Sequence, residues 1–140
     1  MGLHKSKNLS KAKDTADHWF SLYIRLRDAM PNGKAKCITC DKVDDWRGFD
    51  CGHFQSRRYI NTRYDEQNAH SQCVGCNQWG SGEQYKHGLE IDALYGKGTA
   101  QELEQKARSY QKISKVEVME LAREFKKMAE ELAEQKGLEI

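Results

Sequence analysis

Two C-x2-C pairs restrict the fold of this chain more than any other feature of its sequence. Cys37 and Cys40 form the first pair, and Cys73 and Cys76 form the second. Each pair places two sulfurs on one side of a metal ion, so two pairs complete a closed tetrahedral zinc site. Two redox-active C-x2-C motifs are the alternative interpretation. We expect the four thiolates to hold one structural zinc ion.

The segment of residues 37–87 gives a second, independent reason to expect a metal. It contains no Leu and no Met, and its few aliphatic side chains cannot build a core. A structural metal supplies about 10 kcal/mol or more of coupled binding and folding energy. The count of five cysteines is odd, which disfavours a framework of disulfides alone. We expect Cys51 to be a small buried residue, and His70 to pack or hydrogen-bond rather than replace a cysteine ligand.

Helical periodicity precedes this segment. Large apolar residues recur at helical spacing from about Ser10 to Met30, and the sequence P-N-G at 31–33 ends that pattern. The positions concerned are Trp19, Tyr23, Leu26 and Met30, with Phe20, Leu22 and Ile24 beside them. We expect residues 1–9 to be disordered or loosely attached.

Helical patterns resume after Gly88. Residues 89–95 predict a short helix, and capping-box sequences at 99–102 and 114–117 predict helices that reach about 110 and 136. The last helix has an apolar stripe made of Val118, Leu121, Phe125, Met128 and Leu132. This stripe is expected to pack against the N-terminal helix, and a dimer seam is the alternative. Between the flanks we expect short strands around 47–54 and 58–64, and a helix that starts near Cys76.

Positive charge is concentrated near the N-terminus. The net charge is only +2, but residues 1–36 carry eight Lys or Arg against three Asp. A basic arm with Lys5, Lys7, Lys11 and Lys13 is compatible with contact to flanking duplex DNA, and a solvated helix face is the alternative. No apolar run approaches the ~20 residues of a membrane span, and no secretory signal is visible. We expect a single cytosolic domain with no membrane partner.

Three polar residues around the cysteine pairs indicate a second site. Asp50 and His53 lie between the pairs, and Asn77 directly follows the last cysteine. If both pairs grip one ion, Asn77 is held near the zinc at a helix start that the 50–53 strand can cross. A neutral imidazole can take a proton from water, and carboxylate and amide oxygens suit Mg2+ or Mn2+. These groups fit one-metal phosphodiester hydrolysis, and an ordinary packed histidine is the alternative.

The motifs of residues 37–82 resemble those of the NinG/Rap family of lambdoid phage recombination proteins. The matching sequences are C-I-T-C at 37–40, D-C-G-H-F at 50–54, N-A-H-S-Q-C-V-G-C-N at 68–77 and S-G at 81–82. With the helical flanks, the resemblance covers about residues 10–135. The family is described as endonucleases that cut branched recombination intermediates, within the His-Me finger (HNH, ββα-metal) group. The resemblance implies an α+β fold with a zinc-stapled ββα-metal core at 37–87, between helical regions at 1–36 and 88–140.

The resemblance also implies roles for single residues. His53 matches the general base and Asn77 matches the metal-binding Asn. Asn68 resembles the Asn that holds the loop of the base through hydrogen bonds to its backbone. Asp50 lies three residues before His53 rather than directly before it. Residues three apart in a strand point to opposite faces, so Asp50 reaches the metal only if the strand bulges or turns at Gly52.

The insert after His53 is the expected DNA-binding surface. Arginines that contact phosphates alternate there with tyrosines that stack on bases. The residues are Arg57, Arg58, Tyr59, Arg63 and Tyr64. Gln55, Lys86 and His87 are expected to line the same cleft. An ordinary polar loop is the alternative.

These observations lead us to expect a Mg2+- or Mn2+-dependent endonuclease that nicks Holliday junctions, D-loops or flaps. The resemblance places it in the cytoplasm of a bacterial host, encoded by a phage or prophage. Two coordinated cuts in a four-way junction need two active sites, which favours a homodimer. A less selective HNH nickase and a zinc-stabilised DNA-binding module without catalysis are the alternatives.

Overall fold

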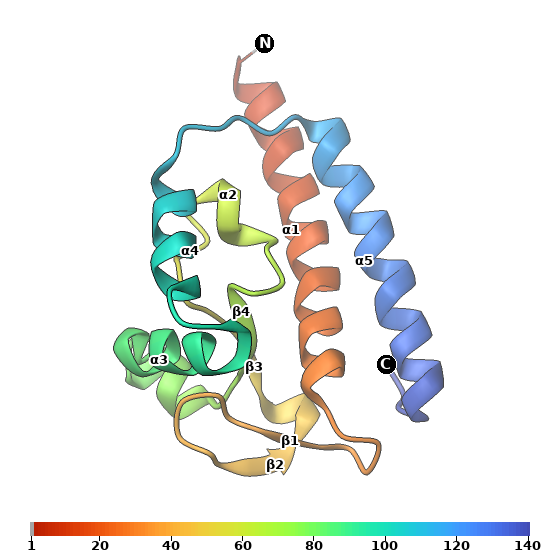
Figure 1. Ribbon diagram of the computed structural model, residues 1–140. Helices are drawn as coiled ribbons and strands as arrows, with labels where there is room; N and C mark the ends of the chain where they lie inside the picture. The colour runs from red at the N-terminus through yellow and green to blue at the C-terminus, as the bar shows by residue number, and fades with distance from the viewer. Residues whose placement is uncertain (1) are drawn as a thin grey trace.

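The computed structural model describes residues 2–140, with side chains from Asn8 onward. Helices occupy both ends of the chain, and short antiparallel strands occupy its middle (Figure 1), which gives the predicted α+β class. The elements follow in the order α1 (Gly2–Asp28), β1 (Lys34–Lys36), β2 (Val43–Asp45), η1 (Trp46–Gly48), β3 (Asp50–His53), α2 (Ile60–Arg63), β4 (Ala69–Gln72), η2 (Gly75–Trp79), α3 (Gln84–Tyr95), α4 (Thr99–Arg108) and α5 (Lys115–Lys136). Among the described residues, no helix has both the length and the apolar composition needed to cross a bilayer.

Helix α1 packs between α5 and the middle of the chain (Figure 1). Its buried positions Ala12, Ala16, Phe20 and Ile24 recur every four residues, and they meet buried residues of α5 along one face. The α5 residues in this seam include Val118 and Phe125 from the predicted stripe. The packing of that stripe on the N-terminal helix is therefore confirmed, and the stripe is not available as a dimer seam.

The two ends of α1 differ from the prediction. The helix begins at Gly2, so the backbone of residues 2–9 is helical rather than disordered, while the side chains of Lys5 and Lys7 lie outside the described residues. At the other end the helix stops at Asp28, and Met30 is 43% exposed because it belongs to the following turn.

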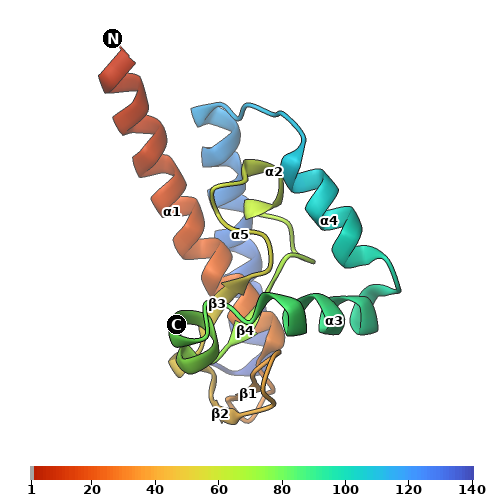
Figure 2. The same cartoon turned by 90° about the vertical axis from the view of Figure 1, so that its left-hand side faces the viewer.

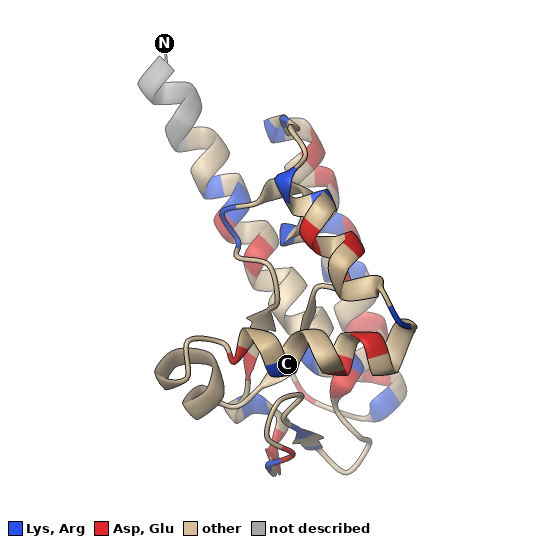
Figure 3. Ribbon diagram, turned by 60° about the vertical axis from the view of Figure 1, so that its left-hand side comes forward, with Lys and Arg blue, Asp and Glu red and all other residues tan. Residues whose placement is uncertain are grey.

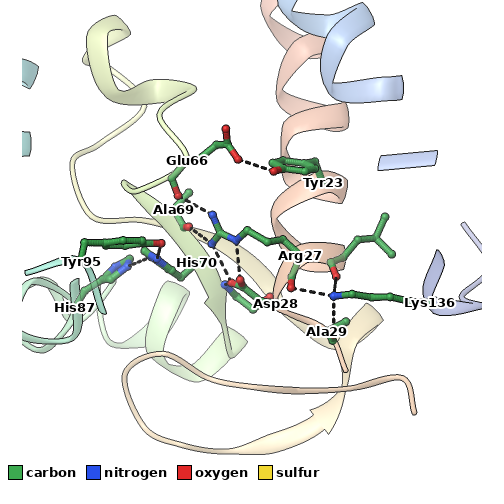
Figure 4. Close-up of polar contacts among 12 residues, drawn as sticks. Tyr23, Arg27, Asp28, Ala29, Glu66, Ala69, His70, His87, Tyr95 and Lys136 are labelled. Carbon is green, nitrogen blue, oxygen red and sulfur yellow. Dashed lines mark hydrogen bonds and ion pairs between the residues drawn. The ribbon is translucent and has the colours of Figure 1, made fainter. Parts of the chain in front are cut away.

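Lys136 caps the C-terminal end of α1. Its Nζ donates to the carbonyl oxygens of Leu26, Arg27 and Ala29 at 2.6, 2.9 and 2.6 Å (Figure 4). The last carbonyls of a helix have no partner within the helix, and a cation there also favours the helix dipole. The end of α5 is thereby fixed to the end of α1.

Two small antiparallel sheets form the middle of the chain. β1 pairs with β2, and β3 pairs with β4 in a regular register that sets Asp50 opposite Gln72 and His53 opposite Ala69. The short π-helix η2 follows β4, close to the predicted helix start at Cys76. The strand predicted at 58–64 is wrong, because residues 60–63 form α2 and β4 supplies the partner of β3.

The middle segment shares its core with the helices on either side. Cys37, Trp46 and Phe49 are buried against Leu26 of α1 and Ala129 of α5. This arrangement agrees with the shortage of aliphatic residues in 37–87. The segment contributes aromatic rings and sulfurs to the cluster, and the flanking helices contribute the aliphatic side chains.

Helices α3 and α4 meet at a sharp bend and cover a separate small cluster of Phe54, Ile91 and Leu103 (Figure 2). α3 begins at Gln84, five residues before the predicted start at Leu89. The capping box predicted at 99–102 is wrong, because Gly98 at φ +97° takes the cap position and Thr99 lies inside the helix. The second capping box is confirmed, since Ser114 Oγ accepts from the backbone N–H of Glu117 at 3.1 Å.

Candidate functional site

The four predicted zinc ligands converge at one end of the sheets. The Sγ atoms of Cys37, Cys40, Cys73 and Cys76 all lie within 4.8 Å of one another, and those of Cys40 and Cys73 are 3.7 Å apart. Tetrahedral zinc with bonds of about 2.3 Å places its sulfurs about 3.8 Å apart. Four close sulfurs with no oxygen ligand among them match the donor set of structural zinc. The cluster therefore has the composition and size of a zinc site.

Backbone hydrogen bonds hold the sulfurs in place. The N–H of Cys73 donates to Cys37 Sγ at 3.3 Å, and the N–H of Cys76 donates to Cys73 Sγ at 3.4 Å. Burial raises the pKa of Cys37, but hydrogen bonds led by the one from Cys73 outweigh it and lower this pKa to about 6. Burial instead raises the pKa of Cys76 to about 12. Sulfurs this close carry charge together only when a cation offsets their repulsion.

Cys51 stands outside the cluster. It lies on β3 and packs beside Phe20 and Ile24. Burial raises the pKa of the Cys51 thiol to about 12, so it is a poor nucleophile at neutral pH. The expectation of a small packed cysteine is met, although part of its surface is accessible.

Asp50, His53 and Asn77 line one pocket next to the cysteine cluster. The pocket has a volume of about 500 Å³, and its walls come from α1, β3, the loop after β3 and η2. Asn77 Nδ2 donates to Asp50 Oδ2 at 3.0 Å. The three predicted residues are therefore brought together, with Asp50 and Asn77 in direct contact.

The route by which Asp50 reaches the pocket differs from the prediction. The register of β3 and β4 is regular from Asp50 to His53, without a bulge at Gly52. Asp50 is the first residue of the strand, and its carboxylate extends to the neighbouring helix η2. Gly52 has another role, because a Cβ at this position would lie 2.1 Å from Gln72 Oε1.

His53 presents one ring nitrogen as a base. Its Nε2 lies 2.9 Å from the carbonyl oxygen of Arg63. A carbonyl only accepts hydrogen bonds, so Nε2 carries the proton in the neutral ring and the lone pair is at Nδ1. Burial lowers the pKa of His53 below 6.5, and the hydrogen bond to Arg63 opposes that shift. The neutral form therefore dominates at physiological pH.

Asn68 ties together the loop that follows His53. It is completely buried, and its side chain accepts from the N–H of Gln55 at 2.8 Å. Its Nδ2 donates to the carbonyl oxygens of Gln55 and Thr62, both at 3.0 Å. Both ends of the 55–62 loop are fixed by one amide, in the manner that the resemblance implies.

The profile of the family described as "Bacteriophage Lambda NinG protein" matches residues 2–135 of this chain. The chain belongs to the NinG family. Two relatives are "Protein ninG" of Escherichia phage 933W, 33% identical over 84 residues, and "Protein ninG" of Escherichia phage lambda, 32% identical over 84 residues. Each match covers 59% of this chain and 39% or 38% of the relative, so it spans about two-fifths of the curated proteins. No solved structure matches the chain.

The cationic residues predicted to bind DNA separate into two groups in this NinG-family chain. Arg57 lines the pocket and Arg58 lies beside it in sequence, and both are exposed. The Arg63 side chain, by contrast, is only 16% exposed and forms a bidentate ion pair with Asp17. Its Nε donates to Asp17 Oδ1 at 2.9 Å, and its Nη2 donates to Asp17 Oδ2. Arg63 is therefore a structural residue that joins α2 to α1, and its assignment to DNA is corrected. Lys86 is exposed, 3.9 Å from Glu83.

The aromatic and polar residues expected at the DNA-binding surface also differ in how far they are buried. Tyr59 is half-buried beneath Arg58, whose guanidinium carbon lies 5.1 Å from the ring centroid. Tyr64 packs on Phe20, and its hydroxyl donates to the Lys13 carbonyl at 3.2 Å, so it has no free face for a base. The expectation that Gln55 lines the cleft is also corrected, because this residue is only 4% exposed.

His70 and His87 form a buried pair away from the pocket. His70 Nδ1 lies 3.0 Å from His87 Nε2, and His70 Nε2 lies 2.9 Å from the Tyr95 hydroxyl (Figure 4). Burial lowers the pKa of both histidines to about 3. The hydrogen-bonding role expected for His70 is confirmed. The expectation that His87 contributes to the cleft is wrong, because His87 is fully buried.

Sequence reasoning missed two residues at the site. Gln78 Nε2 donates to the same Asp50 oxygen as Asn77, also at 3.0 Å. Arg25 of α1 donates from Nε to Ser21 Oγ, which lines the pocket, and its guanidinium lies over the Trp46 ring. Gln78 could have been predicted as a site residue, because it directly follows Asn77 in the sequence. No sequence pattern distinguishes Arg25 from the other arginine of the same helix.

Proposed function

We propose that this NinG-family chain is a divalent-metal-dependent endonuclease that nicks branched DNA such as Holliday junctions, D-loops or flaps. The observation that carries the proposal is the shared pocket of His53, Asp50 and Asn77 beside a four-cysteine cluster. β3 and η2 both line this pocket, and β3 pairs with β4, which η2 follows in the chain, an arrangement compatible with the ββα-metal group.

His53 is the proposed general base. Its Nδ1 has the lone pair, and the bond from Nε2 to the Arg63 carbonyl fixes the ring. A water molecule that enters the pocket would give its proton to Nδ1 as its oxygen attacks the phosphorus, and the P–O bond to the leaving oxygen would break. The fixed ring avoids the need to order the base at the moment of reaction. Asn68 acts as a positioning residue, because it holds the loop whose end supplies the Arg63 carbonyl.

Asp50 and Asn77 fit a divalent cation. A carboxylate and an amide oxygen are the hard donors that Mg2+ and Mn2+ accept, and the two side chains already touch. A half-turn of the Asn77 amide presents Oδ1 instead of Nδ2 to the Asp50 side. When bound, the cation would stabilise negative charge on the scissile phosphate and the leaving oxygen.

Arg57, Arg58 and Lys86 are the proposed phosphate contacts. Each is exposed, and Arg57 lies on the wall of the pocket itself. Contacts of this kind follow the backbone and carry no sequence information, which suits recognition of DNA by its branched shape. Two cuts in a junction still favour a homodimer, formed by a surface other than the α5 stripe.

The test is cleavage of a labelled four-way junction in Mg2+ or Mn2+ by wild type and His53→Ala. We expect His53→Ala to lose a factor of about 10²–10⁴ in rate, the usual contribution of a general base. Its zinc content and junction affinity should match wild type. Exposed His18 provides a matched control, since His18→Ala should cut normally.

Two results would replace this proposal. Equal cleavage of the junction and of linear duplex with the same sequence would favour an unselective nickase. Junction binding without cleavage in either metal would favour a DNA-binding module. The pH profile gives a further check: because the folded pKa of His53 is lowered, cleavage should be lost on acidification only at a pH below 6.5.

A further inference from the structure

Two aromatic side chains close in sequence to the pocket-lining residues within 77–82 are exposed to solvent. Trp79 ends η2 and is 86% exposed, and Tyr85 lies in the first turn of α3 and is 80% exposed. A tryptophan has the largest apolar surface of any side chain and is seldom left uncovered. These two rings are therefore candidates for contact with a ligand.

Trp79 is directly connected to the site. It follows Gln78, whose amide hydrogen-bonds the Asp50 carboxylate, and it precedes the short turn in which Ser81 and Gly82 line the pocket. Residues on both sides of Trp79 in the chain therefore belong to the pocket wall. A strand that enters the pocket would pass close to the loop that carries this ring.

The loop that carries Trp79 is held firmly. Ser81, Gly82 and Glu83 have φ values of 54°, 83° and 45°, which is a costly conformation for the two residues that are not glycine. Gln72 Nε2 donates to the Gly82 carbonyl at 2.8 Å, and the Gly82 N–H donates to the Cys76 carbonyl at 2.9 Å. The exposed position of Trp79 is thus fixed through a zinc-ligand residue and a buried glutamine.

The stretch of chain that carries Trp79 contains no charged residue of its own. No Lys, Arg, Asp or Glu occurs from Cys73 to Gly82, and this stretch forms an uncharged curl that projects from the body (Figure 3). Arg57 lines the pocket with its side chain 61% exposed, although its guanidinium also lies 3.6 Å from the Asp17 carboxylate of the same wall. A nucleic-acid strand fits this arrangement, with phosphates at the exposed guanidinium and bases against the aromatic residues. A stacked, paired duplex shields its base faces, whereas unpaired bases expose them.

We propose that Trp79, with Tyr85 beyond the turn, is a stacking platform for unpaired bases next to the scissile phosphate. This inference rests on the proposed nuclease function. It names the feature of branched DNA that the site selects, which is the unpaired or splayed strand at the branch. Tyr64 of the insert was an aromatic residue expected to stack on bases, but it packs on Phe20. We therefore assign base stacking to Trp79.

The test is DNA binding in Ca2+, with no Mg2+ or Mn2+ added, by wild type, Trp79→Ala, Trp79→Phe and Tyr110→Ala. Tyr110 is the matched control, because it is also 86% exposed but lies in the linker between α4 and α5, at the far end of the molecule from η2 (Figure 1). The probes are an oligonucleotide with unpaired bases, one of them 2-aminopurine, and a fully paired duplex of the same sequence.

Trp79→Ala should weaken binding of the unpaired probe about tenfold and change duplex binding less than twofold. Wild type and Trp79→Phe should quench the 2-aminopurine fluorescence, and Trp79→Ala should not. Tyr110→Ala should behave as wild type. Unchanged affinity of Trp79→Ala for the unpaired probe, or an equal loss for both probes, would overturn the platform.

The outcome for the platform is separate from the outcome for the nuclease. The binding and fluorescence readouts do not depend on cleavage, so a Trp79 effect in a protein that cuts no DNA supports the platform and rejects the nuclease. Cleavage of junctions by His53-containing protein with no Trp79 effect on binding rejects the platform alone.

Discussion

The paired helices α1 and α5 and the zinc-knuckle segment, residues 34–87, are held together by different interactions. Between the helices the contacts are apolar and repeat along a long seam, with Val118 near one end and Ala133 near the other. The zinc-knuckle segment depends on four sulfurs, one buried Asn and an ion pair to α1. Apolar packing is spread over many residues and tolerates small losses, whereas a metal cluster fails as a unit.

This difference matters for function because every residue of the proposed site belongs to the zinc-knuckle segment or to its contact with α1. Polar and metal interactions fix directions as well as distances. The carboxylate of Asp50 and the imidazole of His53 each have a defined hydrogen-bond partner. The helical pair supplies a firm wall behind them.

Loss of one zinc ligand should have the largest effect. Cys73→Ser is expected to remove the metal and unfold residues 34–87, since about 10 kcal/mol of coupled energy is comparable with the whole stability of a domain. The zinc content measured by metal analysis should fall from about one tightly bound ion per chain to none. Hydrogen exchange should show greater loss of protection in 34–87 than near Val118. Cys51→Ser is the control and should keep its zinc, while a folded, metal-free Cys73→Ser protein would contradict the zinc assignment.

Removal of a large ring from the helical seam should cost less. Phe125 is 5% exposed, and its ring centroid lies 4.9 Å from that of Phe20. Phe125→Ala should lower the free energy of unfolding by about 3–5 kcal/mol, as deletion of a buried aromatic side chain does. Zinc content should remain unchanged. Denaturant titration measures this loss. Val116→Ala, on the exposed side of α5, is the control, and its free energy of unfolding should stay within about 0.5 kcal/mol of wild type.

Acidification should weaken the zinc-knuckle segment through the buried histidine pair. The folded pKa of His70 and of His87 is held at about 3, below the 6.5 of the unfolded chain. Protons therefore bind the unfolded state first, so the stabilising effect is complete above pH 6.5 and is lost as the pH falls toward 3. The expected slope is about 1.4 kcal/mol per pH unit for each histidine.

His87→Asn should reduce that slope by about 1.4 kcal/mol per pH unit. Denaturant titrations at pH values where zinc stays bound would measure it. The exposed His18→Asn variant serves as the comparison. Equal slopes in wild type and His87→Asn would show that the pair does not control acid stability.

The smallest effect is expected at the start of α5. Ser114→Ala removes the oxygen that accepts from the Glu117 N–H, which should cost about 1 kcal/mol. Ser114→Asp should retain most of the stability because aspartate is also a good cap. Thr99→Ala tests the contrast with α4, where Gly98 rather than Thr99 takes the cap position. A larger loss for Thr99→Ala than for Ser114→Ala would reverse our assignment of the two caps.

Features that depend on local spacing could be predicted from the sequence. The two C-x2-C pairs determined the four-cysteine cluster, because each pair brings its own two sulfurs to a shared point. The apolar period of α5 determined which face packs, and Ser114 determined where the helix begins. The identities of Asp50, His53 and Asn77 followed from their places beside the cysteines.

Features that depend on a contact with a distant part of the chain could not be predicted from the sequence. Arg63 and Arg57 look alike in the sequence, and both reach Asp17 of α1, but the Arg63 side chain is 16% exposed in its ion pair whereas that of Arg57 remains 61% exposed. His87 lies close to Lys86 along the chain, yet it turns inward to His70. The segment at 58–64 has residues suited to a strand and becomes a helix because β4 takes the place beside β3.

The sequence by itself therefore determined the four-cysteine cluster, the long helices and the identities of the pocket residues Asp50, His53 and Asn77, since each depends on a few neighbouring residues. Only the tertiary structure decided which cations and rings remain exposed to DNA. Whether such a side chain stays exposed depends on which charged or apolar residues from distant parts of the chain pack against it. These long-range contacts cannot be recognised from the neighbouring sequence. Trp79 shows this most clearly, because its side chain remains 86% exposed.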